Sequence, residues 1–223
     1  MLWILAVLLV FTPEVSYAWG PLTHTYLSQQ ILTLSHLIPL SVLSLIRAYK
    51  EYYIYGNIIP DIAIGKKYLS QDKNPHTWTT GLNLFREAKT PEEKSFAYGF
   101  LTHLAADAKL HHDIRDLNPL QHAIFELKAD RIIDRVYWFQ IMTINKNVRK
   151  LSERFFEKTL SNFTFKTSKR IYKSFIFLSA FNRGELKNSE EFNIFHLKSL
   201  TAMLEILNEG EKAKIINYSP HYL

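Results

Sequence analysis

The chain has 223 residues, a formal net charge of +6 and 47% apolar residues, enough to bury the core of one globular domain. It contains no cysteine, which excludes a disulfide framework, a thiol nucleophile, an iron–sulfur cluster and a cysteine-based zinc finger. Any metal site must therefore use His, Asp, Glu or backbone atoms. Neither of the glycine-rich loops that cradle nucleotide phosphates, GxGxxG and GxxxxGK[ST], is present.

The first eighteen residues have the pattern of an export signal. An apolar run over residues 1–11 leads to Ser16-Tyr17-Ala18, a small-x-small sequence typical of signal cleavage. The run is short for a bilayer span, although an uncleaved membrane anchor remains the alternative. We predict a signal peptide at residues 1–18 and a mature domain at residues 19–223, which begins with Trp19. The mature domain is expected in the periplasm or outside the cell.

The rest of the chain has helical spacing of apolar residues nearly throughout. Thr90-Pro91 is a strong helix start, Gly210 is a helix end, and the stretch over residues 55–80 has the Gly, Pro, Asn and Asp content of a long functional loop. No alternating strand pattern competes with the helices. We predict one all-α bundle of about seven to nine helices, with helices over residues 22–35, 39–53, 91–112, 120–142, 147–160, 167–182 and 189–208.

Two of these helices carry polar residues on the face that should be buried. The inward face of the helix over 91–112 changes from aromatic to polar, in the order Phe96, Phe100, His103, Asp107 and His111. The face of the helix over 120–142 runs through His122, Phe125, Glu126, Ala129, Ile133 and Val136. Buried carboxylates need a counter-charge, and a divalent cation binds both carboxylate and neutral imidazole.

The spacing of these polar residues also favours a metal. His103 and Asp107, like His122 and Glu126, are four residues apart, which places two ligands one helical turn from each other. Three residues upstream have the right chemistry, but each is equally consistent with a helix cap, a turn residue or a packed imidazole. They are His24, Asp61 and His76.

Taken in order, these residues resemble the zinc-dependent phospholipase C family. The resemblance rests on Trp19, His24, Asp61, His76, His103, Asp107, His111, His122 and Glu126, and on the segments GNIIPD and THLAADAKLH. The family includes exported bacterial phospholipases C and the N-terminal domain of glycosylphosphatidylinositol-specific phospholipase D, and single-strand-specific zinc nucleases are related to it. The resemblance covers about half of the mature chain.

The resemblance implies a site for three zinc ions and a role for each of the nine residues. The free amine and carbonyl of Trp19, together with His24, match the ligands of one ion, and Asp107 matches the carboxylate that bridges it to a second. The second ion would take Asp61, His76 and His103, and the third would take His111, His122 and Glu126. His112 is the alternative to His111, and Asp61 is also the candidate catalytic residue.

The implied activity is hydrolysis of phospholipid head-group ester bonds, with attack of metal-activated hydroxide on phosphorus. Two features point to different classes of substrate. The short spacing from Trp19 to His24 is closer to the nucleases, whereas Glu126 is typical of the phospholipases, since the nucleases usually carry Asp there. The alternatives are a zinc-dependent single-strand nuclease, which would act on nucleic acid, and a zinc-binding module without turnover.

The positive charge is concentrated between Lys146 and Lys173, where nine Lys or Arg accompany two Glu. Two interpretations stay open: solvated helix faces, or a surface that attracts an anionic membrane or nucleic acid. The remaining histidines, His36, His196 and His221, are assigned to packing or to the surface. The oligomeric state has no signal in the sequence.

Overall fold

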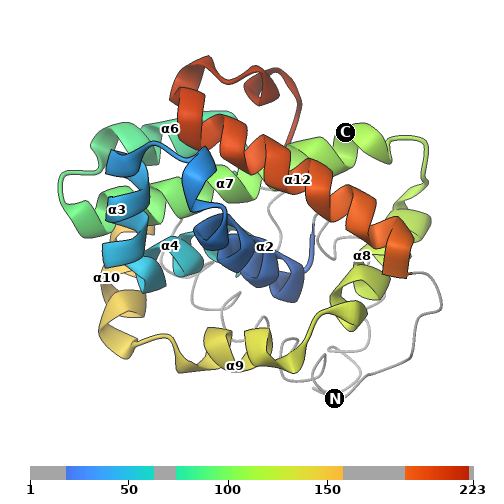
Figure 1. Cartoon of the computed structure of the whole chain (residues 1–223), viewed down its shortest axis with the longest axis horizontal. Coiled ribbons are helices and arrows are strands. Elements are labelled where there is room, and N and C mark those ends of the chain that lie inside the picture. Colours follow the sequence, from blue (N-terminus) through green and yellow to red (C-terminus); the bar gives the residue numbers. More distant parts are fainter. Residues whose placement is uncertain (1–18, 63–73, 158–188, 221–223) are drawn as a thin grey trace.

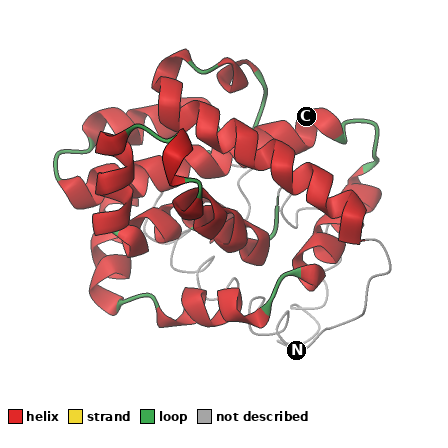
Figure 2. Ribbon diagram, in the orientation of Figure 1, coloured by secondary structure: helices red, strands yellow, loops and turns green. Residues whose placement is uncertain are grey.

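The computed structural model describes residues 19–62, 74–157 and 189–220, and these form a single all-α domain with no strand among them (Figures 1 and 2). The predicted fold class is therefore confirmed. The predicted signal peptide at 1–18, the helix predicted over 167–182, most of the basic run and His221 lie outside the described residues. In chain order the described α-helices are α2 (Pro21–Thr33), α3 (Leu40–Ala48), α4 (Lys50–Gly56), α5 (Ile59–Ile62), α6 (Trp78–Glu87), α7 (Pro91–Asp113), α8 (Pro119–Ile132), α9 (Arg135–Thr143), α10 (Lys146–Phe156) and α12 (Ser189–Glu209).

Helix α7 is the central element, and its start was predicted correctly. The Thr90 hydroxyl accepts a hydrogen bond from the Glu93 amide, and the Glu93 carboxylate accepts one from the Thr90 amide, both at 3.2 Å. This capping box satisfies amides that the first helical turn leaves unpaired. From there α7 runs through the middle of the bundle and contacts α4, α6 and α12 (Figure 1).

Two predicted helices are interrupted in the structure. The helix predicted over 39–53 is divided into α3 and α4 at Tyr49, whose backbone leaves the helical region (φ −117°, ψ 45°). The helix predicted over 120–142 ends after Ile132, and α9 starts at the N-cap Asp134, whose side chain accepts from the Val136 amide at 2.8 Å. The expectation that Val136 continues the buried face is therefore wrong, and this residue is exposed.

The stretch predicted to be irregular over residues 55–80 contains more helix than expected. It includes the end of α4, the single turn α5 and the start of α6, whose N-cap Thr77 accepts from the Thr80 amide at 3.3 Å. The stretch that follows the last predicted helix forms short 3-10 turns over Gly210–Lys212 and Lys214–Asn217.

Helices α4 and α7 cross with their backbones in contact. A Cβ atom added to Gly99 would lie 2.0 Å from the Tyr53 carbonyl oxygen, and one added to Gly56 would lie 2.1 Å from the Phe96 carbonyl oxygen. Only glycine fits at both positions. This crossing brings Asn57, at the end of α4, against the middle of α7.

The core is aromatic at one end of α7 and polar towards the other. Phe96 contacts Phe155 and Phe100 contacts Phe156, with ring centroids 5.9 Å and 5.6 Å apart, and all four rings are buried. Further along the same face the buried residues are His103, Asp107 and His111. The inward face predicted for α7 is thus the buried one.

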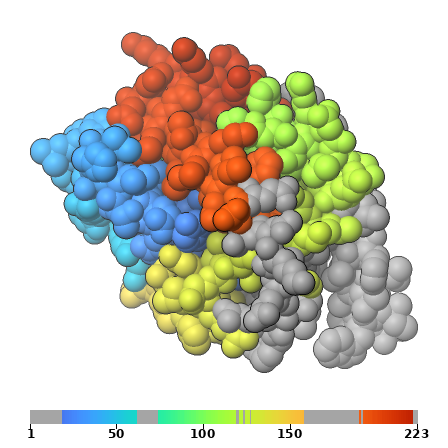
Figure 3. All heavy atoms as spheres, turned by 45° about the vertical axis from the view of Figure 1, so that its right-hand side comes forward, coloured from blue at the N-terminus to red at the C-terminus, as the bar shows by residue number. Residues whose placement is uncertain are grey.

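Helix α12 lies across α7 and beside α2 (Figures 1 and 3). Its buried face includes Phe192, His196, Ser199 and Met203, at steps of three or four residues. Within residues 19–62, 74–157 and 189–220, no helix has the length and apolar content that crossing a bilayer requires.

Candidate metal centre

Five polar side chains that are far apart in the sequence converge beside α7. His24 comes from α2, Asp61 from α5, His76 from the turn before α6, and His103 and Asp107 from α7. Four of them are at most 1% exposed and Asp61 is 7% exposed. Such a concentration of ionisable groups out of water requires mutual compensation or a bound cation.

The Asp107 carboxylate lies at the centre of this cluster. Its Oδ1 is 3.1 Å from Nε2 of His24 and 3.3 Å from the backbone nitrogen of Trp19, which donates to it. Its Oδ2 is 3.1 Å from Nε2 of His103 and 3.6 Å from Nε2 of His76. The two oxygens therefore face two different sets of nitrogen atoms, as a carboxylate that bridges two cations must.

Asp61 lies near the same three imidazole Nε2 atoms as Asp107. Its Oδ1 is 3.2 Å from Nε2 of His76 and 3.8 Å from Nε2 of His103, and its Oδ2 is 3.8 Å from Nε2 of His24. Two groups of three among the described residues have ligand atoms that all lie within 4.8 Å of one another: His24, Asp61 and His103, and His76, His103 and Asp107.

The hydrogen bond of His103 fixes which ring nitrogen faces the cluster with a lone pair. Its Nδ1 lies 2.9 Å from the carbonyl oxygen of Asn57, which can only accept, so Nδ1 carries the proton. In the neutral imidazole Nε2 then presents its lone pair, and this atom is 3.1 Å from Nε2 of His76. A backbone carbonyl that holds the outer nitrogen is the usual support of a metal-binding histidine.

The charges within the cluster shift the pKa values of its members. Burial alone would raise the pKa of Asp107, but His103 and His24 hold it well below its ordinary value. For His24 burial opposes protonation, yet the Asp107 and Asp61 carboxylates raise the pKa of the ring. Asp107 is thus an anion surrounded by imidazoles.

The donor set fits zinc. Neutral imidazole nitrogen and carboxylate oxygen are zinc ligands, and the absence of cysteine leaves no thiolate to compete for the ion. Within the part of the chain that the structure describes, the buried Nδ1 of His24 has no hydrogen-bond partner.

The residues of the third predicted set lie in a row next to the first two sets, but they are not among the groups of described residues whose ligand atoms all lie within 4.8 Å of one another. Nδ1 of His111 is 3.0 Å from Nε2 of His122, and their rings stack. Glu126 meets the opposite nitrogen of His122, with Oε1 2.9 Å from Nδ1. Burial lowers the pKa of His122 to about 4, against a smaller opposing effect of Asp107, so this imidazole is neutral near pH 7 and able to bind a cation.

The remaining histidines are distributed between surface and core. His112, the alternative to His111, is exposed and packs on the ring of Tyr218 at 4.3 Å, while His111 is buried. His36 is exposed and His196 is buried, in keeping with the surface or packing role expected for both.

Sequence reasoning missed residues that support the cluster from outside. Asn57 accepts from His103 through its carbonyl, and its side-chain amide donates to the carbonyl of Gly99 at 2.9 Å. Asp130 accepts from the amide and the hydroxyl of Thr23, at 2.9 Å and 2.7 Å. Asp130 lies one turn after Glu126 on α8, so the continued spacing of four could have identified it.

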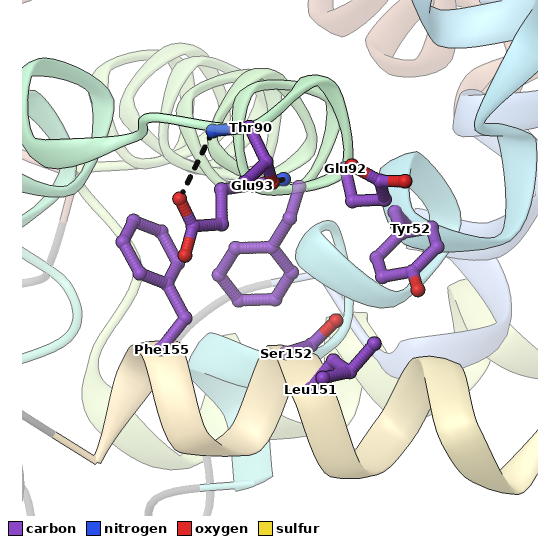
Figure 4. Close-up of a pocket in the computed structure, with 8 residues that line it drawn as sticks. Tyr52, Thr90, Glu92, Glu93, Leu151, Ser152 and Phe155 are labelled. Atoms are coloured by element: carbon purple, nitrogen blue, oxygen red, sulfur yellow. Dashed lines mark hydrogen bonds between the residues drawn. The ribbon is translucent and has the colours of Figure 1, made fainter.

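A cavity of about 210 Å³ lies elsewhere, between α4, the start of α7 and α10 (Figure 4). Its lining residues are Tyr52, Thr90, Glu92, Glu93, Phe96, Leu151, Ser152 and Phe155. No residue of the metal cluster lines this cavity, which is therefore a separate feature of the fold.

Comparison with known proteins agrees with the chemistry of the cluster. No curated protein and no solved structure was found to match the chain. A family model described as zinc dependent phospholipase C matches residues 23–177, more than half of the chain. The matched region contains every one of the converging His, Asp and Glu side chains and leaves Trp19 and α12 outside. The chain therefore belongs to the zinc-dependent phospholipase C family.

Proposed function

We propose that this chain is an exported zinc-dependent phosphodiesterase that hydrolyses the head-group ester bonds of phospholipids. One observation supports this more than any other: the buried Asp107 and Asp61 carboxylates both lie within 4 Å of the same three imidazole Nε2 atoms. Membership of the family gives the general chemistry, a zinc-dependent hydrolase of the phospholipase C type.

The proposed ligands form three sets around α7. The first set is His24, Asp107 and the backbone of Trp19, and the second is Asp61, His76, His103 and Asp107. The third set is His111, His122 and Glu126. Zinc held there would supply a Lewis acid for the phosphodiester and a water molecule of lowered pKa.

The protein groups have their own part in the reaction. Asp61 is the most exposed of the five central side chains, so its carboxylate is the one best placed to meet a substrate and to accept a proton from the nucleophile. Asp107 is deeply buried and strongly ionised, so it serves to bind cations rather than to exchange protons. Asn57 holds His103 in the tautomer that binds metal.

Export completes the first set in this proposal. Removal of residues 1–18 would create a free α-amine at Trp19, and the Trp19 nitrogen already lies 3.3 Å from Asp107 and near the His24 ring. A free amine could bind a cation through its lone pair, whereas the lone pair of an amide nitrogen is delocalised and does not. We propose that signal cleavage therefore activates the site.

An assay of substrate class tests the proposal. The protein that begins at Trp19 is incubated with vesicles of phosphatidylcholine or phosphatidylinositol and with single-stranded DNA, each with and without a chelator. We expect chelator-sensitive release of the phosphorylated head group from lipid. Cleavage of DNA without cleavage of lipid would indicate the nuclease alternative, and no cleavage of either would indicate a zinc-binding module.

A pair of matched variants links the activity to the cluster. Asp61→Asn keeps the shape of the side chain but removes its charge, and we expect kcat to fall at least about 100-fold, as for loss of a general base. Asp116→Asn makes the same change at an exposed position and should leave kcat unaltered. Equal activity of the two variants would remove Asp61 from the mechanism.

A further inference from the structure

We propose that α12 and α8 form a receptacle for the side chain of Trp19, which holds the backbone of this residue against the metal centre. The receptacle consists of Ser199 and His196 on α12 and Phe125 on α8. The inference rests on the proposed function, in which the Trp19 backbone binds zinc. It assigns positioning residues on α12, which lies beyond the region that the family model matches.

The Trp19 ring is enclosed on all sides. It is 0% exposed, and its centroid lies 5.1 Å from that of His196 and 6.0 Å from that of Phe125. Its Nε1 donates to the Ser199 hydroxyl at 2.8 Å. The indole is therefore fixed both by packing and by a directional hydrogen bond, which together allow one orientation of the ring.

Ser199 also links Trp19 to the helix that carries the metal ligands. The Ser199 hydroxyl donates to the carbonyl of Ala106 at 3.4 Å, and the next residue is Asp107, whose Oδ1 accepts from the Trp19 nitrogen. One contact holds the indole and the other holds the backbone nitrogen of the same residue. The position of that nitrogen relative to Asp107 is thus fixed from both ends of Trp19.

The segment that follows Trp19 is held by a second element. Asp130 on α8 accepts from the Leu22 amide as well as from Thr23, and so fixes the first turn of α2. A Cβ added to Gly20 would lie 2.2 Å from the Asp130 carboxylate, so the chain passes directly over it. Trp19 and His24, the two proposed ligands of one ion, are joined by a segment that is clamped along its length.

Chelation by itself does not explain this arrangement. The backbone amine and carbonyl would bind a cation whatever the side chain, so a fully buried indole with its own hydrogen-bond partner has to serve another purpose. Outer contacts that orient metal ligands typically change metal affinity about 10- to 100-fold. The geometry therefore indicates that α12 tunes the affinity of the site that contains Trp19.

The first test compares two hydroxyl deletions on α12. Ser199→Ala removes the acceptor for the indole, whereas Thr201→Ala removes an exposed hydroxyl that bonds only the carbonyl of Leu197, one turn back on the same helix. Zinc dissociation constants are measured by chelator competition on protein confirmed by mass spectrometry to begin at Trp19. We expect the zinc affinity of the site that contains Trp19 to fall about tenfold in Ser199→Ala and to be unchanged in Thr201→Ala.

A double-mutant cycle separates positioning from general damage to the fold. Trp19→Phe keeps an aromatic ring and removes the Nε1 donor, so Ser199→Ala should have no further effect on zinc affinity in that background. Additive losses would show that Ser199 acts by some other route and would overturn the receptacle. Equal zinc affinity of Ser199→Ala and Thr201→Ala would overturn it as well, with the proposed function intact. Absence of zinc binding by the unaltered protein would instead contradict the proposed function itself.

Discussion

His111 and His112 are neighbours with opposite surroundings. His111 lies on the inward face of α7 with its Nδ1 3.0 Å from His122, whereas His112 projects to the surface and packs on Tyr218. A single step along a helix rotates a side chain by about 100°. The sequence favoured His111 as the ligand because it continues one helical face. The structure supports this choice, because His111 is buried and His112 is exposed.

This contrast makes a clean test of the third metal set. We expect His111→Ala to lower the zinc content by about one ion per chain, because it removes one of only two imidazoles in that set. His112→Ala should retain the full content. The measurement is elemental analysis of the two purified variants side by side, and an equal loss in both would remove His111 from the ligands.

Asp130 gives the protein a predictable dependence on pH. Burial raises the pKa of Asp130 from 3.8 to about 6, although hydrogen bonds from Thr23 and Leu22 oppose the shift. The pKa of Asp130 is thus higher in the folded than in the unfolded protein. Protonated Asp130 therefore contributes its full stabilisation of the folded state below pH 3.8, and this contribution is lost as the pH rises through 6.

The variant Asp130→Asn cannot ionise and should lack this dependence. The free energy of unfolding of the unaltered protein should fall relative to that of Asp130→Asn by about 2 kcal/mol between pH 4 and pH 7. Urea denaturation of both proteins at several pH values, with zinc in excess, measures the difference. Parallel curves for the two proteins would show that Asp130 does not titrate in this range.

Most proposed metal ligands could be identified from the sequence because each combines a suitable residue type with a recognisable position. His103, Asp107, His122 and Glu126 follow the helical period, and His24, Asp61 and His76 occur in the order that the family resemblance requires. The supporting residues could not be found in this way. Asn57 acts through its backbone carbonyl, which every residue possesses, so no pattern of side chains reveals it.

At the scale of elements, the contact between α4 and α7 controls how the metal ligands are arranged. It places the end of α4 against His103 and depends on two glycines with no room for a side chain. Gly99→Ala would drive a Cβ into the backbone of Tyr53, which cannot move without displacing α4. We expect this variant to lose about 3 kcal/mol of stability, at the upper end of the usual cost of overpacking.

Gly81→Ala on α6 is the matched control. Its added Cβ would lie 2.7 Å from a terminal carbon of Leu104, the mobile end of a side chain. Alanine is also favoured over glycine in a helix by about 1 kcal/mol, so the net change should be within about 1 kcal/mol of zero. Thermal denaturation of the two variants shows which substitution costs more stability. A smaller loss of stability for Gly99→Ala than for Gly81→Ala would contradict the packing described for α4 and α7.

Most of the described helices were predictable because their apolar spacing and their caps agree, as at Thr90. The interruption at Tyr49 was not, since apolar periodicity continues through it, and at Asp134 the same periodicity outweighed the local signal of an N-cap residue. The start of helix α6 was missed because Asn74 and Pro75 suggest a loop. Its N-cap Thr77 was the available signal and was outweighed by these breakers.

At the scale of the whole molecule, the ligands come from both halves of the described chain and meet beside one long helix. His24 and Asp61 precede α7, while His122 and Glu126 follow it, and α12 closes over Trp19. A core with this many buried imidazoles and carboxylates is stable only when their charges are balanced. Bound cations would therefore contribute to folding as well as to chemistry.

The zinc content of the mature protein tests this explanation most directly. The protein that begins at Trp19, with its first residue checked by mass spectrometry, is purified without chelator and analysed for metals. The arrangement of the three ligand sets predicts about three zinc ions per chain, with at least two retained after dialysis. A protein that is folded and contains no zinc would contradict the proposed metal centre and the hydrolase built on it.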